Sequence, residues 1–241
     1  MERILNLIKT DHKETEKRIF PRFPYSYLMF KGESKHADKV FEVKDISYTG
    51  MQISLKDGGH SYVVGEKITG NLHWRELTLE TDGEVKWVQG ARLGISFKKD
   101  LKFQRKVTEF LSFKNIIKSM RPIHKSNFAL DLPVNLKYWL RADGQIEIFI
   151  WQHNDLVTAK FEIILMRKFV DWEDGKGLRT GKILVSRDVD TPLTSEDELL
   201  FEIDEGIDEE KVNLASNVVD LIPIEYLPQD IVDFIRVKLR Q

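Results

Sequence analysis

The chain of 241 residues contains no cysteine, and proline and glycine are scarce, with 7 and 14 residues. The lack of cysteine excludes disulfides, iron–sulfur clusters, thiolate zinc sites and cysteine nucleophiles. The low proline and glycine content argues against a linker or a fibre. No stretch is apolar over the length that a membrane span needs, and the first residues, MERILNLIKTDHKETEKR, are too charged for a signal peptide. We therefore expect a cytoplasmic protein without membrane insertion.

Charge is unevenly distributed along a chain that is 41% hydrophobic and 32% charged, a composition typical of a folded protein. The formal net charge of −2 divides into +8 over residues 1–125 and −10 over residues 126–241. The first part could attract a polyanion, whereas the second should repel one. Because no recognition motif accompanies the basic part, long nucleic acid is not an expected partner.

The first half reads as short strands, because apolar residues alternate with others from position 23 to position 97. Tyr27 and Met29 share one face in this pattern, and Val85 and Trp87 continue the period of two. Asp57-Gly58-Gly59, Gly70-Asn71 and Asp82-Gly83 are typical of turns. Strands at this spacing without intervening helices predict an antiparallel barrel.

The period changes after residue 100. Apolar residues from Phe103 to Met120 recur at helical spacing, and Pro122 stands where a helix commonly ends. The apolar side of this helix is expected to cover the barrel or to dock a second domain.

The second half predicts strands over 134–140, 146–151, 158–166 and 199–203, with a hairpin turn at Asp143-Gly144. A closing amphipathic helix over 225–240 could turn five apolar side chains toward the core: Leu227, Ile231, Phe234, Ile235 and Val237. The expected fold class is α+β: an antiparallel β-barrel followed by a helix, then a second α+β domain of unassigned topology. The expected division is an N-terminal segment 1–15, a barrel domain 16–121 and an output or interaction domain 122–241.

Two short motifs carry the functional interpretation. Arg18 and Arg22 are separated by three residues, and the segment Asp45-Ile46-Ser47-Tyr48-Thr49-Gly50 follows after the length of one strand. Together they resemble the PilZ family pattern, R-x-x-x-R and then D-x-S-x-x-G, and residues 92–97 resemble the last barrel strand of such domains. The resemblance covers residues 16–115. It implies a receptor for cyclic di-GMP whose site contains Arg18, Arg22, Asp45, Ser47 and Gly50.

The chemistry of these residue types fits that ligand. An arginine can fork onto phosphate oxygens or onto guanine O6 and N7, and Pro21 and Pro24 favour an extended arm around Arg22. Asp45 can accept hydrogen bonds from guanine N–H groups, and a serine hydroxyl such as that of Ser47 can bond base or phosphate. Gly50 permits a positive φ and a close approach to the backbone.

Two further positions extend the candidate site. Lys17 stands where many PilZ members have another arginine, so the stoichiometry, one nucleotide or a stacked pair, stays open. Gly94, in the segment that resembles the last barrel strand, is the other additional candidate.

No enzyme signature is present. The glycine-rich segment 175–182 lacks the spacing of a phosphate loop and favours a hairpin turn, and the six histidines lack metal-ligand spacing. The five tryptophans favour core or interface positions. The sequence thus predicts a non-catalytic cyclic di-GMP effector without cofactor or metal, acting on a protein partner through its C-terminal domain. The alternatives are a PilZ-like scaffold that binds no nucleotide, and general nucleic-acid binding with steep salt dependence.

Overall fold

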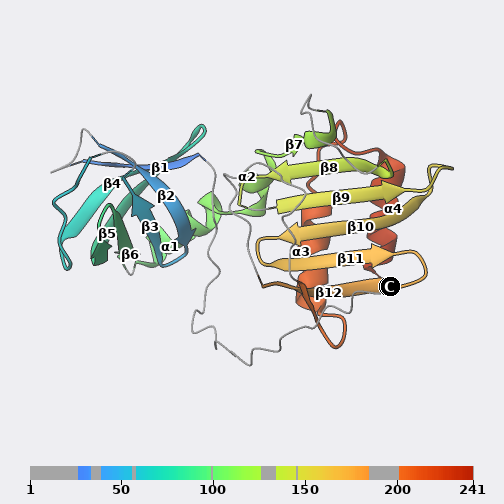
Figure 1. Ribbon diagram of the computed structural model, residues 1–241. Coiled ribbons are helices and arrows are strands. Elements are labelled where there is room, and N and C mark those ends of the chain that lie inside the picture. The colour runs from blue at the N-terminus through green and yellow to red at the C-terminus, as the bar shows by residue number, and fades with distance from the viewer. Residues whose placement is uncertain are drawn as a thin grey trace, which may run out of the picture.

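The computed structural model describes residues 27–33, 39–55, 58–98, 100–125, 134–144, 146–184 and 201–240. Figure 1 shows a closed barrel, two helices that lead away from it, and an antiparallel sheet with two further helices. This arrangement confirms the predicted fold class. Within these residues, no helix has the length and apolar character needed to cross a membrane.

The barrel consists of six antiparallel strands in the order β1-β2-β3-β6-β5-β4. It closes because β1 pairs with β2 on one side and with β4 on the other, which leaves no open edge. Alternate side chains such as Phe30, Phe41 and Leu72 are fully buried inside it. The strands are β1 (Leu28–Gly32), β2 (Val40–Ser47), β3 (Gly50–Ser54), β4 (Lys67–Trp74), β5 (Leu77–Gln89) and β6 (Arg92–Phe97).

Two predictions about the barrel need correction or refinement. Tyr27 and Met29 share a face, but it is the outer one, with exposed fractions of 64% and 45%. The turns predicted at Gly70-Asn71 and Asp82-Gly83 are wrong, because these residues lie within β4 and β5. A Cβ on Gly70 would lie 2.6 Å from the ring of Phe30. The glycine serves close packing inside the barrel rather than a turn.

The helix predicted from residue 103 to 120 is two helices, α1 (Leu101–Phe110) and α2 (Phe113–Ile117). The side-chain amide of Asn115 donates to the carbonyl of Glu109 at 2.8 Å, which satisfies an end group of α1 where the chain turns. Phe110 meets Trp74 edge-on, so α1 packs on the barrel, whereas α2 contacts α3 (Glu209–Val219) of the second unit. One helix was predicted to cover the barrel or to dock the second domain. In the structure α1 covers the barrel and α2 contacts the second unit.

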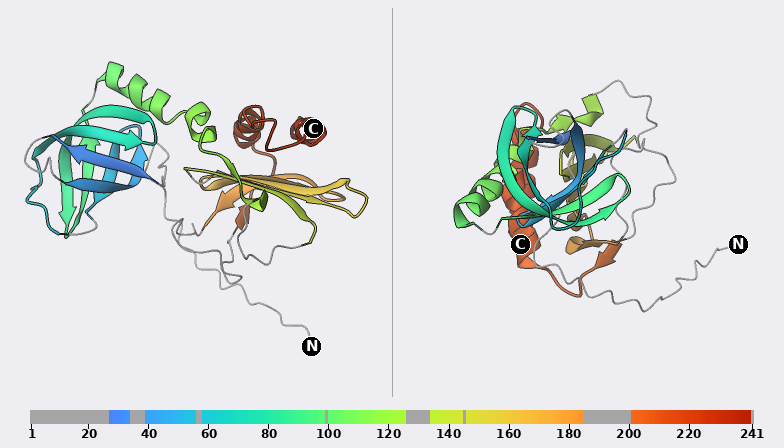
Figure 2. Two further views of the ribbon diagram at one scale, coloured as in Figure 1. Left: turned by 90° about the horizontal axis from the view of Figure 1, so that it is seen from above. Right: turned by 90° about the vertical axis from the view of Figure 1, so that its left-hand side faces the viewer.

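The second unit is a seven-stranded antiparallel sheet in the order β13-β12-β11-β10-β9-β8-β7. Figure 2 shows α3 and α4 (Gln229–Leu239) on the same face of this sheet. Ile148, Ile163 and Val170 face these helices and join one buried apolar cluster with Val218 and Ile235. The strands are β7 (Arg121–Pro122), β8 (Leu136–Ala142), β9 (Ile146–Gln152), β10 (Thr158–Leu165), β11 (Lys168–Glu173), β12 (Gly177–Ile183) and β13 (Phe201–Ile203); η1 (Ile123–Lys125) is a 3-10 turn.

Most predicted elements of this unit are confirmed, including the hairpin turn at Gly144, where φ is positive. Several details differ. Strands β7, β11 and β12 were not predicted, and most of the segment 175–182, expected as a hairpin turn, belongs to β12, with the turn at residues 174–176. The closing helix begins only at Gln229, after Pro228, and Val237 is 56% exposed rather than in the core. Helix α3 was not predicted.

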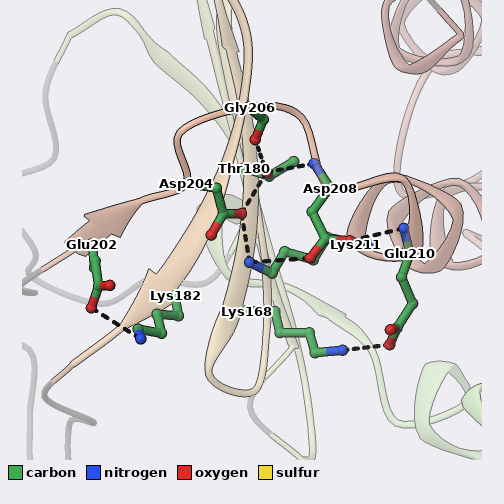
Figure 3. A network of polar contacts seen from close by, with 9 residues as sticks. All are labelled: Lys168, Thr180, Lys182, Glu202, Asp204, Gly206, Asp208, Glu210 and Lys211. Carbon is green, nitrogen blue, oxygen red and sulfur yellow. Dashed lines mark hydrogen bonds and ion pairs between the residues drawn. The ribbon is translucent and has the colours of Figure 1, made fainter. Parts of the chain in front are cut away.

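A polar network fixes the N-terminus of α3 to the sheet (Figure 3). Lys211, with only 8% of its surface exposed, donates to Asp204 at 2.6 Å and lies 3.5 Å from Asp208. The hydroxyl of Thr180 also donates to Asp204, at 2.6 Å. Burial raises the pKa of Asp204, but the hydrogen bonds from Lys211 and Thr180 outweigh it and lower the pKa overall.

The barrel and the second sheet meet through a buried polar contact. Trp74 Nε1 and Arg75 Nε both donate to Asp143 Oδ2, at 3.0 and 3.1 Å. The backbone N–H of Asp143 donates to the hydroxyl of Ser119, just beyond α2, at 2.8 Å. The predicted division at residue 121 stays a prediction; the second sheet takes its first strand at Arg121.

Candidate ligand-binding site

The structure brings four of the seven candidate residues together on the outer surface of the barrel. Asp45, Ser47, Gly50 and Gly94 line one shallow cavity of about 220 Å³. Arg18, Arg22 and Lys17 lie outside the described residues, so their place in the site stays a prediction.

Strand register arranges the cavity as a row. Asp45 pairs with Gln52, Gln52 with Gly94, and Gly94 with Trp87, so one residue from each of β2, β3, β6 and β5 lies side by side. Neighbouring strands are about 4.8 Å apart, and because the barrel is curved, the backbones of Asp45 and Trp87 are at most about 14 Å from each other. The row therefore has an acid at one end, an indole at the other, and an amide and a glycine between them.

Two β-bulges turn the ends of this row outward. In β2 the register shifts between Val43 and Asp45, and in β5 it shifts between Val85 and Trp87. Val43 and Val85 are buried in the core, and an unbroken period of two would bury the residues two positions later as well. The extra residue of each bulge instead directs Asp45 and Trp87 to the cavity, a use of bulges that is common beside functional sites.

Gly94 makes room for the indole of Trp87. A Cβ on Gly94 would lie 2.0 Å from Trp87 Nε1, so the ring lies directly over the glycine. Trp87 is 37% exposed, which leaves part of its surface open to the cavity. An exposed aromatic ring held in place in this way can stack on a planar base.

Side-chain hydrogen bonds close the Ser47–Gly50 turn. The Ser47 hydroxyl accepts from the backbone N–H of Thr49 at 3.3 Å and lies 3.2 Å from the carbonyl of Gly50. The expectation that Gly50 needs a positive φ is wrong, because Gly50 has no such backbone angle. A Cβ there would instead lie 2.3 Å from the carbonyl oxygen of Ile95, so the glycine is required for the close approach of β6.

The cavity itself contributes little positive charge. Among its described lining residues, the cation is Lys86, which pairs with Glu84 at 2.5 Å. An anionic ligand would need cations from elsewhere, and the preceding basic segment with Arg18 and Arg22 could supply them. In the described ranges, no three histidine or carboxylate side chains gather as metal ligands would.

Sequence reasoning missed seven residues that line the cavity: Thr49, Met51, Gln52, Lys86, Trp87, Ile95 and Ser96. The alternating pattern placed Trp87 on the same face as Val85, because a bulge leaves no trace in hydrophobic periodicity. Lys86, Ile95 and Ser96 lie beside the motif only through strand pairing, which a linear pattern does not contain.

The family model of the PilZ domain matches residues 16–112, which include the whole cavity. Residues 16–112 are identified as a PilZ domain. PilZ domains form a family of cyclic di-GMP receptors, not of catalysts. Among solved structures, the PilZ domain with c-di-GMP of YcgR from Escherichia coli aligns with 13% identity and a TM-score of 0.36, over 40% of this chain and 89% of that chain. Comparison with curated proteins finds no match.

Proposed function

We propose that this protein is a non-catalytic receptor that binds cyclic di-GMP on the barrel face formed by the Asp45–Trp87 row. The observation that carries the proposal is the row itself: the register places the motif acid, a glycine and an indole along one line on adjacent strands. Asp45 would accept from the N–H groups of a guanine, and Trp87 would stack on a base. One ligand could make both contacts, because Asp45 and Trp87 line the same cavity.

The arm that carries Arg18 and Arg22 supplies the missing cations in this proposal. Strand β1 pairs Met29 with Glu42 and Phe30 with Phe41. The arm therefore joins the barrel at β1, beside β2, the strand that carries Asp45. Five residues span at most about 17 Å, so the chain between Arg22 and Tyr27 is long enough for Arg22 to reach the Asp45 end of the row. Its guanidinium would fork onto a phosphate of the ligand.

The size of the cavity also favours a contribution from the arm. Small-molecule sites usually enclose about 300–1,000 Å³, whereas this cavity measures about 220 Å³. The barrel face can therefore receive one part of a cyclic dinucleotide and leaves the rest to be covered. A bound ligand would favour the arm position in which the arm contacts the ligand and the barrel face together. This is a shift of population toward the closed state.

The second domain is the proposed output. Its junction with the barrel is built on Trp74, Arg75 and Asp143, so the two units share contacts that a change in the barrel could alter. We propose that residues 122–241 present this change to a protein partner in the cytoplasm, in control of motility, adhesion or exopolysaccharide production. The proposed binding of cyclic di-GMP requires no further cofactor or metal.

Calorimetric titration of cyclic di-GMP into the full chain tests the proposal. Asp45→Ala should weaken binding about ten- to one-hundredfold, because hydrogen bonds to a charged group contribute about 1.5–3 kcal/mol. Asp82→Ala is the matched control: this acid also lies on the barrel, outside the cavity lining, and pairs with Lys98 at 3.5 Å. GMP should bind more weakly than cyclic di-GMP. Wild-type protein without affinity for cyclic di-GMP would leave a PilZ scaffold that acts by protein contacts alone.

A further inference from the structure

A second cavity, of about 430 Å³, lies on the opposite part of the barrel. Its described lining residues are Tyr27, Met29, His73, Arg75 and Arg121. The first four come from the start of β1 and the end of β4, and Arg121 comes from β7 of the second sheet. The Asp45–Trp87 row uses β2, β3, β6 and β5, so the two cavities share no strand of the barrel. The volume is within the usual range of small-molecule sites.

The lining is rich in nitrogen donors and poor in acids. Arg121 has no acidic partner among the described residues, and in the β7–β8 pair it stands directly opposite Arg141. Like charges in that position repel each other, and Arg141 turns to Glu147 at 3.5 Å. The nearby Asp143 carboxylate, 2% exposed, is occupied by Arg75 and Trp74. The cavity therefore has excess positive charge that a bound anion would neutralise.

The backbone and the side chain of Arg75 are both held in place. Its φ of 55° is in the left-handed region, the geometry of the two-residue hairpin turn that joins β4 to β5. Its Nε donates to Asp143 at 3.1 Å, and 42% of the side chain stays exposed. Within the described part of the chain, its terminal nitrogens make no hydrogen bond, so they are available to a ligand.

We propose that this cavity binds a phosphate-bearing anion of about the size of a mononucleotide. Arg75 and Arg121 would hold the phosphate oxygens, since planar guanidinium groups match phosphate geometry. His73 supplies a further ring nitrogen, and Tyr27 and Met29 form an apolar wall for the organic part of the ligand. Because Arg75 belongs to the barrel and Arg121 to the second sheet, the anion would tie the two units together. The proposal does not rest on cyclic di-GMP binding.

Titration calorimetry on the full chain with two probes, GMP and inorganic pyrophosphate, tests this site. Arg121→Gln should weaken binding of both probes about tenfold or more. Arg105→Gln, the same change at an exposed position of α1, should leave both affinities unchanged. Tyr27→Ala should weaken binding of GMP but not of pyrophosphate, because only GMP has a base to place against the ring.

Three results would overturn the proposal. They are the absence of binding by either probe, an equal loss in the Arg121 and Arg105 variants, and an unchanged affinity in Arg121→Gln. A parallel titration with cyclic di-GMP separates the two cavities: Arg121→Gln should bind it as the wild type does. If that variant also lost cyclic di-GMP, the second cavity would be part of the first site and not a separate one.

Discussion

The outer face of the barrel and the N-terminus of α3 both gather polar side chains, but they use them differently. Around α3, Lys211 is almost buried and its one charge has two protein partners, Asp204 and Asp208, both within 3.5 Å. On the barrel, Asp45 and Trp87 line a cavity open to a ligand. The charge cluster around α3 stabilises the fold, whereas the side chains that bulges turn outward form the barrel face proposed to bind the ligand.

The largest expected effect is on folding stability, and it comes from Gly50, on the barrel face. Gly50→Ala would force a Cβ against the carbonyl of Ile95, and because both are backbone positions in paired strands, neither can move easily. We expect a loss of about 3 kcal/mol in the free energy of unfolding, at the upper end of overpacking. Urea unfolding measures it, with Gly59→Ala as control, since nothing lies within 4 Å of a Cβ there. Equal stability of the two variants would contradict this account of Gly50.

Lys211→Ala should act on folding alone. It removes charged hydrogen bonds worth about 2 kcal/mol, a value reduced because Asp204 and Asp208 are 29% and 38% exposed and can be hydrated. Cyclic di-GMP affinity should not change. Lys182→Ala, which breaks a half-exposed pair with Glu202, should cost far less. If Lys211→Ala weakened ligand binding without affecting stability, the distinction between the regions would fail.

Trp87→Ala should do the reverse. Loss of one stacked base costs about 1.5 kcal/mol of binding, slightly more than tenfold, while stability changes little because the ring is partly exposed. Gly94→Ala should mimic it by displacing the indole. The affinity of Gly94→Ala for cyclic di-GMP is measured by tryptophan fluorescence titration. The affinity of Trp87→Ala, which lacks this indole, is measured by calorimetry. An unchanged affinity in both variants would show that the indole does not contact the ligand.

The smallest expected effect is a pH dependence in the second domain. Burial lowers the pKa of His124 below its ordinary value of about 6.5, and the backbone N–H of Trp139 donates to its Nδ1 at 3.2 Å. The unfolded chain therefore takes up the proton more readily than the folded one. The stability that neutral His124 contributes is complete above about pH 6.5 and is lost as pH falls through the lowered pKa of the folded state. When pH is lowered from about 7.5 to about 5.5, the melting temperature should fall less in His124→Asn than in the wild type. An identical decline in both proteins would contradict the assignment.

Sequence patterns predicted the barrel, the strand-rich second unit and the motif residues, because these depend on local periodicity and spacing. They placed Trp87 wrongly, since a single bulge residue reverses the face of everything that follows in a strand. They also assigned turns at Gly70 and Gly83, where glycine serves close packing. The row from Asp45 to Trp87 depends on the pairing of strands that are distant in sequence, which no linear pattern specifies.

The most direct test of the central claim is amide NMR of the full chain during titration with cyclic di-GMP. The account predicts shifts at the backbone amides of Gly50 and Gly94 and at the indole N–H of Trp87, with Lys211 and its neighbours unaffected. Shifts that gather on the second sheet, or no shifts at all, would contradict ligand binding at this face of the barrel.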